Sequence, residues 1–283
     1  MDIKQWGTPN PNWLIELLLY WEGHINSRAI TELFAVTRQT AGKWIKTYHT
    51  ETGLPVDYQA SSKAFHAPVF HTPHYISGAI DEYLDWRQLG LFPNRSHDTQ
   101  VSETQGVTRI VMPRRFVAPE IMRPLIQALD SGTAADANYL SISGSAAQER
   151  ILYPHTFVKA ANRWHVRAYC EHARDFRDFV LSRFISVDFD GTPATFTAKD
   201  DQAWSAPVEI ILEPDQRLTS QQKAIIEHDY GMQNGQLVIA TTGALVKYTL
   251  DDLQIKTKML EVNPQAQQLV CVNYADIKPW LYD

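Results

Sequence analysis

Apolar residues recur three or four positions apart in three stretches of the first fifty residues, and this spacing predicts three helices. The first helix covers residues 13–21 and ends at Gly23. Ser27 is a candidate N-cap for the second helix, and Thr37 is one for the third. Only two residues separate the second helix from the cap of the third. A turn that short is typical of a helix-turn-helix motif.

The third helix turns its polar side chains outward, because Ala41, Trp44, Ile45 and Tyr48 form an apolar stripe that we expect to be buried. No Asp or Glu occurs over residues 33–50. A basic, acid-free helix face suits the major groove of DNA. The candidate contacts to bases or phosphates are Arg38, Gln39, Thr40, Lys43 and Lys46. The alternative is a solvated helix face in a three-helix domain that binds protein.

A hairpin is expected directly after the third helix. Strand-like runs over residues 54–58 and 64–69 flank a turn at residues 60–63. In a winged helix, such a hairpin is the wing, and Ser62, Lys63 and His66 would contact backbone phosphate or the minor groove. A plain surface hairpin fits the same pattern.

The remaining elements mix helices and strands. The middle of the chain predicts a helix at 78–89, a strand at 108–112, a helix from Pro119 to about 129, a polar turn at 130–136 and four strands. The last part predicts strands at 208–212, 236–240 and 269–272 and helices at 220–229 and 244–253. The expected fold class is therefore α+β multidomain, ending in a small α/β sandwich of the ferredoxin-like kind.

Polar stretches give the domain boundaries. Residues 1–92 form a winged helix-turn-helix DNA-binding domain with a linking helix, and residues 93–106 form a linker. Residues 107–192 form a middle domain, residues 193–206 a second linker, and residues 207–283 a C-terminal domain.

Residues 139–183 alternate polar and apolar side chains with a period of two, which predicts strands with one polar face. The groups expected to share a side are Tyr139, Ser141 and Ser143, then His165, Arg167 and Tyr169, then Arg177, Phe179, Leu181 and Arg183. A sheet of this kind can bury one face and offer the other to a polar ligand.

The arginines in this stretch indicate an anionic ligand. Guanidinium groups bind phosphates and carboxylates through two parallel hydrogen bonds. We expect Arg167, Arg177 and Arg183 to converge on a nucleotide-like or nucleic-acid ligand. The other candidate ligand contacts are Tyr139, Ser141, Ser143, His155 and Tyr169. Internal pairing is the alternative, because acidic residues lie close in sequence, namely Glu149, Glu171, Asp175 and Asp178.

The same stretch resembles the WYL domain of bacterial transcriptional regulators. The run Arg150-x-x-x-Pro154-His155 matches the family pattern, as do Arg167, Tyr169 and the strand from Phe176 to Arg183. The Trp-Tyr-Leu tripeptide itself reads Trp164-His165-Val166, so two of its three positions differ. This variant is most similar to the BrxR/CapW subgroup, regulators found beside phage-defence operons. The resemblance implies a winged helix, a central Sm-like β-barrel WYL domain and a C-terminal dimerisation domain.

Composition adds bounds to this picture. The 283 residues are 44% hydrophobic and carry a net charge of −6, so the basic helix stands out against an acidic chain. No run approaches the ~20 apolar residues that span a bilayer, and no signal peptide is recognisable, so we expect a cytoplasmic protein without a membrane partner. Cys170 and Cys271 are isolated and expected to be reduced. Motifs for catalysis, metals and cofactors are not found, so neither an enzyme nor a cofactor is expected.

These observations predict a ligand-responsive transcription factor. As a homodimer it would bind an inverted-repeat operator in double-stranded DNA and repress a phage-defence operon. An anionic nucleotide or nucleic-acid effector bound by the middle domain would release it. The alternative is a nucleic-acid- or nucleotide-binding accessory protein of a defence system without operator specificity.

Overall fold

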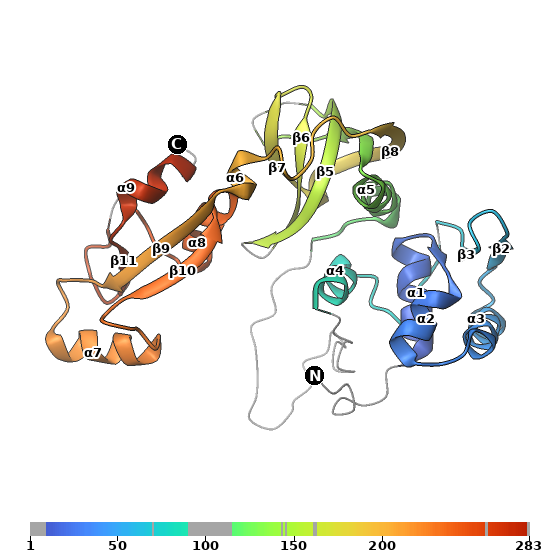
Figure 1. Cartoon of the computed structure of the whole chain (residues 1–283), viewed down its shortest axis with the longest axis horizontal. Coiled ribbons are helices and arrows are strands. Elements are labelled where there is room, and N and C mark those ends of the chain that lie inside the picture. Colours follow the sequence, from blue (N-terminus) through green and yellow to red (C-terminus); the bar gives the residue numbers. More distant parts are fainter. Residues whose placement is uncertain are drawn as a thin grey trace.

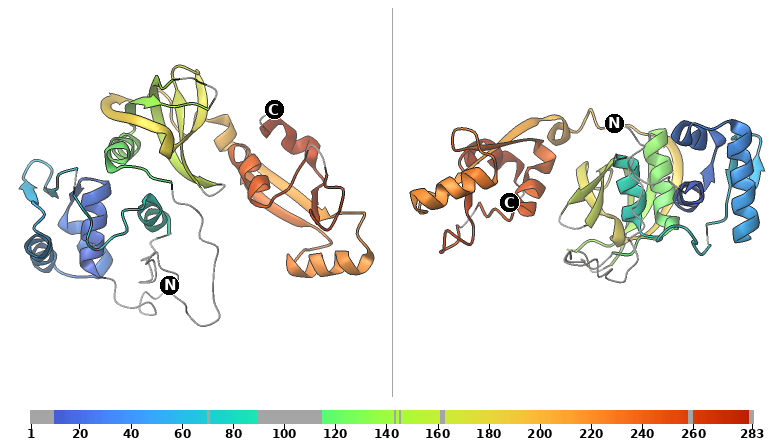
Figure 2. Two further views of the ribbon diagram at one scale, coloured as in Figure 1. Left: turned by 180° about the vertical axis from the view of Figure 1, so that it is seen from behind. Right: turned by 90° about the horizontal axis from the view of Figure 1, so that it is seen from below.

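The computed structural model describes residues 10–69, 71–89, 115–142, 144, 146–160, 163–257 and 260–281. Figure 1 shows three folded parts, with the middle domain between the winged helix and the C-terminal domain, and Figure 2 shows the same order from two other sides. The predicted linker at residues 93–106 and the predicted strand at residues 108–112 lie outside the described residues. Within the described part, no helix is both long and apolar enough to cross a membrane.

The N-terminal part is a winged helix. Its helices are α1 (Pro11–Trp21), α2 (Ser27–Phe34) and α3 (Arg38–Thr52), and its strands are β1 (His24–Ile25), β2 (Asp57–Gln59) and β3 (Ala64–His66) in the order β1-β3-β2. Thr37 caps α3 as predicted, since its hydroxyl accepts the Thr40 N–H at 3.2 Å. The predicted Ser27 cap is wrong, because Asn26 accepts the Ala29 N–H and Ser27 is the first helical residue.

Two helices connect the winged helix to the middle domain. These are α4 (Ile80–Leu89) and α5 (Pro119–Ser131). One continuous apolar core runs from α1 through α4 and α5 into the middle sheet. The C-terminal domain has a separate core. The winged helix and the middle sheet therefore share one apolar core, whereas the C-terminal domain has its own and follows the sheet through the short helix α6 (Gln202–Ser205).

The middle domain is one antiparallel sheet in the order β7-β6-β5-β4-β8. The strands are β4 (Thr133–Tyr139), β5 (Gln148–Ala160), β6 (Arg163–Cys170), β7 (Asp175–Val180) and β8 (Phe184–Pro193), with the 3-10 helix η2 (Leu181–Arg183) before β8. No pairing between the edge strands β7 and β8 occurs among the described residues, so the sheet is open there and Sm-like closure is not confirmed.

Two predictions for this sheet are wrong. Residues 130–136 are not a polar turn, because β4 starts at Thr133. The strand expected over residues 139–143 ends at Tyr139 instead. Ala, Asp and Asn disfavour strands, but β4 is central and pairs with β5 and β8, and its alanines are buried beneath neighbouring side chains. Tertiary pairing has overridden local preference.

The C-terminal domain follows the predicted alternation closely. A short helix α6 (Gln202–Ser205) leads into β9 (Pro207–Pro214), α7 (Ser220–Asp229), β10 (Leu237–Thr242), η3 (Gly243–Leu245), α8 (Val246–Asp252), β11 (Leu269–Cys271), α9 (Tyr274–Ile277) and η4 (Lys278–Trp280). The described strands form an antiparallel sheet in the order β10-β9-β11. This is a small α/β layer, and its ferredoxin-like detail is not confirmed.

Candidate nucleic-acid interface and sensor face

Helix α3 presents the predicted polar side chains to solvent. Arg38, Gln39, Lys43 and Lys46 are exposed, and Thr40 is half-buried. Thr40 is also tied to the helix cap, because its hydroxyl lies 3.0 Å from that of Thr37. On the inner side, Ala41, Ile45 and Tyr48 are buried, which fixes the outward orientation of the basic side chains.

The wing is shorter than predicted and carries its polar groups at the tip. Ser62 and Lys63 are exposed in the turn, and Lys63 has a left-handed φ of 52°. His66 Nε2 forms a hydrogen bond with Ser62 Oγ at 2.8 Å, and its ring stacks on that of His24 with the centroids 5.6 Å apart. Burial, and then the neighbouring His24, lower the pKa of His66.

The sequence analysis did not identify a role for Glu16 of α1, whose carboxylate is fully buried inside the winged helix. It accepts the Tyr48 hydroxyl at 2.9 Å and the backbone N–H groups of His74, Tyr75 and Ile76. Burial and the Glu16 charge raise the pKa of Tyr48, which keeps its hydroxyl protonated as a donor. A single acid inside the apolar stripe of α1 was the available signal. Glu16 holds α3 against α1 and the segment before α4.

Arg123 of α5 joins the middle domain to the winged helix. Its guanidinium donates to the carbonyls of Leu19 and Tyr20 at the end of α1 and to those of Ala67 and Pro68 just after β3. Helix α4 adds further contacts, since Trp164 of β6 donates to Asp81 at 3.0 Å. These hydrogen bonds connect the middle domain to α1, to the end of the wing and to α4.

Arg167 of β6 is buried in a polar cluster at the junction with the C-terminal domain. Its Nε lies 2.5 Å from Oδ2 of Asp201, its Nη2 lies 3.1 Å from Oδ1, and its Nη1 lies 3.3 Å from Asp178. His155 Nε2 is 3.3 Å from the same Asp201 carboxylate, and Tyr248 of α8 donates to Asp178 at 3.0 Å. Internal pairing through Asp178, left open by the sequence, is therefore present.

The Asp201 carboxylate stays ionised in this cluster. Burial alone would raise the pKa of Asp201, but the hydrogen bonds from Arg167 and the Trp204 N–H outweigh it and lower the pKa. Burial lowers the pKa of His155, although Asp201 opposes the shift. Sequence reasoning missed Asp201 because it lies 34 positions from Arg167 along the chain.

Tyr139 and Tyr169 lie in packed aromatic clusters. Tyr139 packs edge-on against Phe179 and Phe184, and its hydroxyl accepts the Val180 N–H at 3.0 Å. Tyr169 stacks on Phe196 with ring centroids 3.8 Å apart. Ser141 lies in the loop after β4, and Ser143 is outside the described residues. Tyr139 and Tyr169 are thus packed among aromatic side chains, and Tyr169 shares a side of β6 with His165 and Arg167 as expected.

The expected convergence of the three arginines is wrong. Arg167 pairs across the sheet with Asp178, whereas Arg177 pairs with Ala168, so Arg177 lies on the opposite face. Arg177 is exposed and contacts Asp175 at 3.2 Å. Arg183 is half-buried and lies in η2 rather than on a strand, so it does not continue the alternation of β7.

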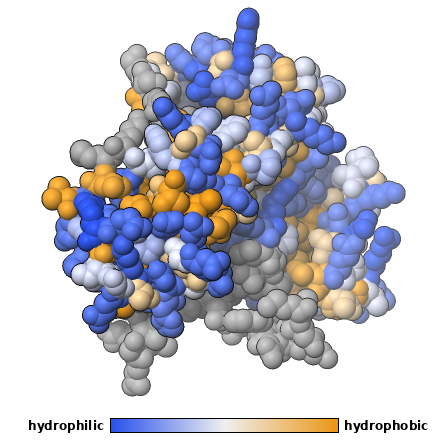
Figure 3. Space-filling model, turned by 60° about the vertical axis from the view of Figure 1, so that its left-hand side comes forward, coloured by the Kyte–Doolittle hydropathy of each residue, from blue (hydrophilic) through white to orange (hydrophobic). Residues whose placement is uncertain are grey.

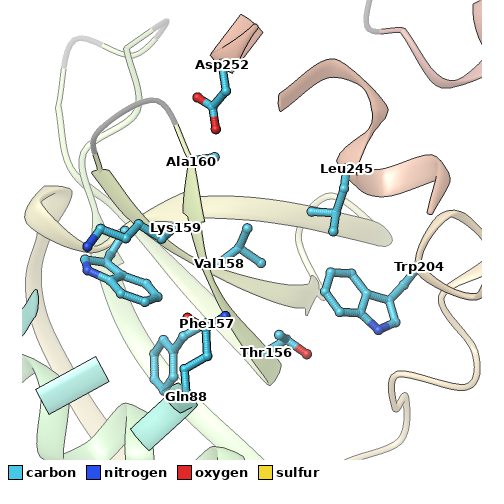
Figure 4. A pocket seen from close by; sticks show the side chains of 10 residues that line it. Gln88, Thr156, Phe157, Val158, Lys159, Ala160, Trp204, Leu245 and Asp252 are labelled. Carbon is cyan, nitrogen blue, oxygen red and sulfur yellow. The ribbon is translucent and has the colours of Figure 1, made fainter. Parts of the chain in front are cut away.

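A cavity of about 650 Å³ lies beside this cluster, at the junction of the three domains. Figure 4 shows Thr156 and Val158 of β5 on one side and Trp204 of α6 and Leu245 of η3 on the other. Gln88 of α4, Lys159 of β5 and Asp252 of α8 also line it. Three or more His, Cys, Asp or Glu side chains able to hold a metal do not come together among the described residues.

Three family models match the chain in order. They are the BrxR transcriptional regulator winged helix-turn-helix domain at residues 10–89, the WYL domain at residues 120–189, and the BrxR transcriptional regulator C-terminal dimerization domain at residues 207–277. The first range contains α3, the second contains Arg167, His155 and Asp178, and the third contains the β10-β9-β11 sheet.

Relatives match over nearly the full length. The DNA-binding transcriptional repressor CapW of Pseudomonas aeruginosa is 27% identical over 97% of this chain and 92% of its own. CapW of Escherichia coli (strain KTE188) is 27% identical over 96% and 91%. A solved structure, proteasome accessory factor B/C (PafBC) of Arthrobacter aurescens, is 16% identical over 83% of this chain and 43% of that chain with a TM-score of 0.28, too low to bear on function.

The first and last parts of the molecule thus match domains of a transcriptional regulator, and the part between them matches a WYL domain. The chain belongs to the WYL-domain DNA-binding transcriptional repressors of the BrxR/CapW type.

Proposed function

We propose that this repressor binds an inverted-repeat operator as a homodimer, controls a phage-defence operon, and is released when its middle domain binds an anionic nucleotide or nucleic acid. In this proposal residues 1–92 bind DNA, residues 107–192 sense the effector and residues 207–283 dimerise. The observation that carries the proposal is the acid-free, solvent-exposed start of α3, which is held outward by the Thr37 cap and by the Glu16 bond to Tyr48.

The DNA contact is proposed to centre on Arg38, Gln39, Lys43 and Lys46. Side chains on the first turns of such a helix reach base edges in the major groove. Ser62, Lys63 and His66 of the wing would approach the flanking backbone. Arg38 and the lysines would supply the electrostatic attraction to the phosphates.

The dimer contact is proposed to use the outer face of the C-terminal sheet. The helices and the core cover one face, which carries Ile210 and Leu212. On the other face, Ile211 pairs with Val238, and Val238 and Val272 are 50% and 45% exposed. Figure 3 shows apolar side chains gathered on the side where the C-terminal domain comes forward. An exposed apolar sheet face of this kind suits a second copy of the chain.

A footprint on the DNA upstream of the gene tests the proposal. A dimer of winged helices should protect two half-sites related by a two-fold axis, with centres about 34–36 Å or a multiple apart. Protection without symmetry, or equal affinity for unrelated DNA, would favour the accessory-protein alternative.

A further inference from the structure

The carboxylate of Asp201 lies where an oxyanion would be expected to bind. Two parallel hydrogen bonds from one guanidinium, at 2.5 and 3.1 Å, and a third group, His155 at 3.3 Å, surround it. Phosphate oxygens accept the same bidentate contact from arginine. The side chains are enclosed, since Arg167 is 3% exposed and Asp201 is 1% exposed.

Asp201 belongs to the segment that leads into the C-terminal domain. It is the N-cap of α6, where it accepts the Trp204 N–H at 3.0 Å, and β9 starts two residues after α6 ends. The linker predicted at residues 193–206 is therefore anchored at Asp201. A second polar contact, from Tyr248 to Asp178, joins α8 to β7. Both contacts hold the C-terminal domain against the polar face of the middle sheet.

The neighbouring cavity gives a ligand access to this cluster. Thr156, which lines the cavity, pairs across the sheet with Arg167 and bonds to His155 at 2.9 Å. Trp204, whose backbone N–H donates to Asp201, lines the opposite side and offers a flat aromatic surface. His165 on the same sheet face is buried, and its Nδ1 has no hydrogen-bond partner in the part of the chain that the structure describes.

We infer that this junction is an anion site occupied at rest by Asp201, and that a ligand carrying a phosphate group competes with Asp201 for Arg167 and His155. Displacing Asp201 frees the start of α6 and weakens the contact between the C-terminal domain and the middle sheet. The ligand thereby changes how the two winged helices of the dimer are spaced. This inference rests on the proposed ligand-responsive function, and it places the ligand between domains rather than on an open sheet face.

Competition predicts that removing the internal carboxylate strengthens anion binding. Asp201→Asn keeps the size of the side chain and its ability to cap α6, but it removes one of the two carboxylate charges that pair with Arg167, the other being that of Asp178. Asp200→Asn is the matched control, because Asp200 is an exposed carboxylate that bonds only to Thr197 among the contacts observed. Binding of inorganic pyrophosphate to the full-length protein is measured by isothermal titration calorimetry. We expect at least ten-fold tighter binding by Asp201→Asn than by the wild type and by Asp200→Asn.

A second variant tests the same site in case Asp201→Asn fails to fold. Tyr248→Phe removes the other polar contact to the sheet without touching the Arg167–Asp201 pair, and it should tighten pyrophosphate binding several-fold. Hydrogen exchange should show faster exchange in residues 202–205 and 246–252 when pyrophosphate is added to the wild type. Equal affinities in all four proteins, or no binding in any of them, would overturn the anion site.

Operator binding by the same preparations separates this inference from the proposed function. If the wild type protects an inverted repeat while Asp201→Asn and Asp200→Asn bind pyrophosphate alike, only the anion site is wrong. If the wild type binds no operator, the proposed function fails whatever the calorimetry gives.

Discussion

Replacing Glu16 by leucine should destabilise the winged helix strongly, although position 16 lies in an apolar helix. The carboxylate accepts one hydroxyl and three backbone N–H groups, with distances of 2.9 Å to Tyr48, His74 and Ile76. Leucine satisfies none of these donors. Each buried donor left without a partner costs about 1–3 kcal/mol, and burying leucine returns about 1.5–3 kcal/mol. Because the partly exposed N–H groups can bond to water, we expect a net loss of about 3–5 kcal/mol.

Urea unfolding followed by tryptophan fluorescence measures this loss, because Trp13, Trp21 and Trp44 lie in the winged helix. Tyr48→Phe removes one of the bonds and should cost about 1.5–3 kcal/mol, since the acceptor is charged. Glu32→Gln is the matched control, because Glu32 is exposed and pairs only with exposed Arg28, so its loss should stay below about 1 kcal/mol. A Glu16→Leu protein as stable as Glu32→Gln would refute the role given to Glu16.

Three further predictions concern the dimer, the arginines and pH. Val238→Lys should weaken the dimer at least ten-fold in analytical ultracentrifugation. The control Val262→Lys changes a valine that is 95% exposed and lies off the sheet, so it should leave the dimer unchanged. Equal effects of the two variants would place the interface elsewhere. Arg177→Ala should leave both induction and operator affinity unchanged in a reporter assay with DNA binding measured in parallel, because its side chain lies on the face opposite Arg167; loss of induction would contradict this placement. Burial lowers the folded-state pKa of His71, His155 and His165, so below about pH 6.5 the unfolded chain binds more protons than the folded one. The free energy of unfolding should therefore fall as the pH drops below about 6.5. Urea midpoints that stay constant from about pH 7.5 to 5.5 would contradict this prediction.

The winged helix was predictable because its signals are local. Apolar spacing identified α1, α2 and α3, and Thr37 capped α3 as expected. Strand β1 escaped prediction, since a two-residue strand shows no period. The C-terminal helices and strands were predictable for the same reason as α3, because each carries its own period and end signals.

The polar cluster was only partly predictable because it depends on long-range pairing. Alternation within a strand shows which residues share a side, but not which face of the sheet that side joins. Arg177 and Phe179 do share a side, yet that side faces away from Arg167. Asp201 could not be assigned from spacing, since the chain passes through β7 and β8 before α6 brings it back to Arg167.

Operator binding by Lys43→Ala tests the DNA interface most directly. Lys43 is exposed on α3, and Lys223 on α7 of the C-terminal domain provides the control for losing one positive charge. Affinity for the footprinted operator is measured by fluorescence anisotropy across a series of salt concentrations. We predict that Lys43→Ala lowers affinity and reduces the slope of log affinity against log salt by about one, while Lys223→Ala changes neither. Unchanged affinity and slope in Lys43→Ala would contradict the assignment of α3 as the DNA-reading helix.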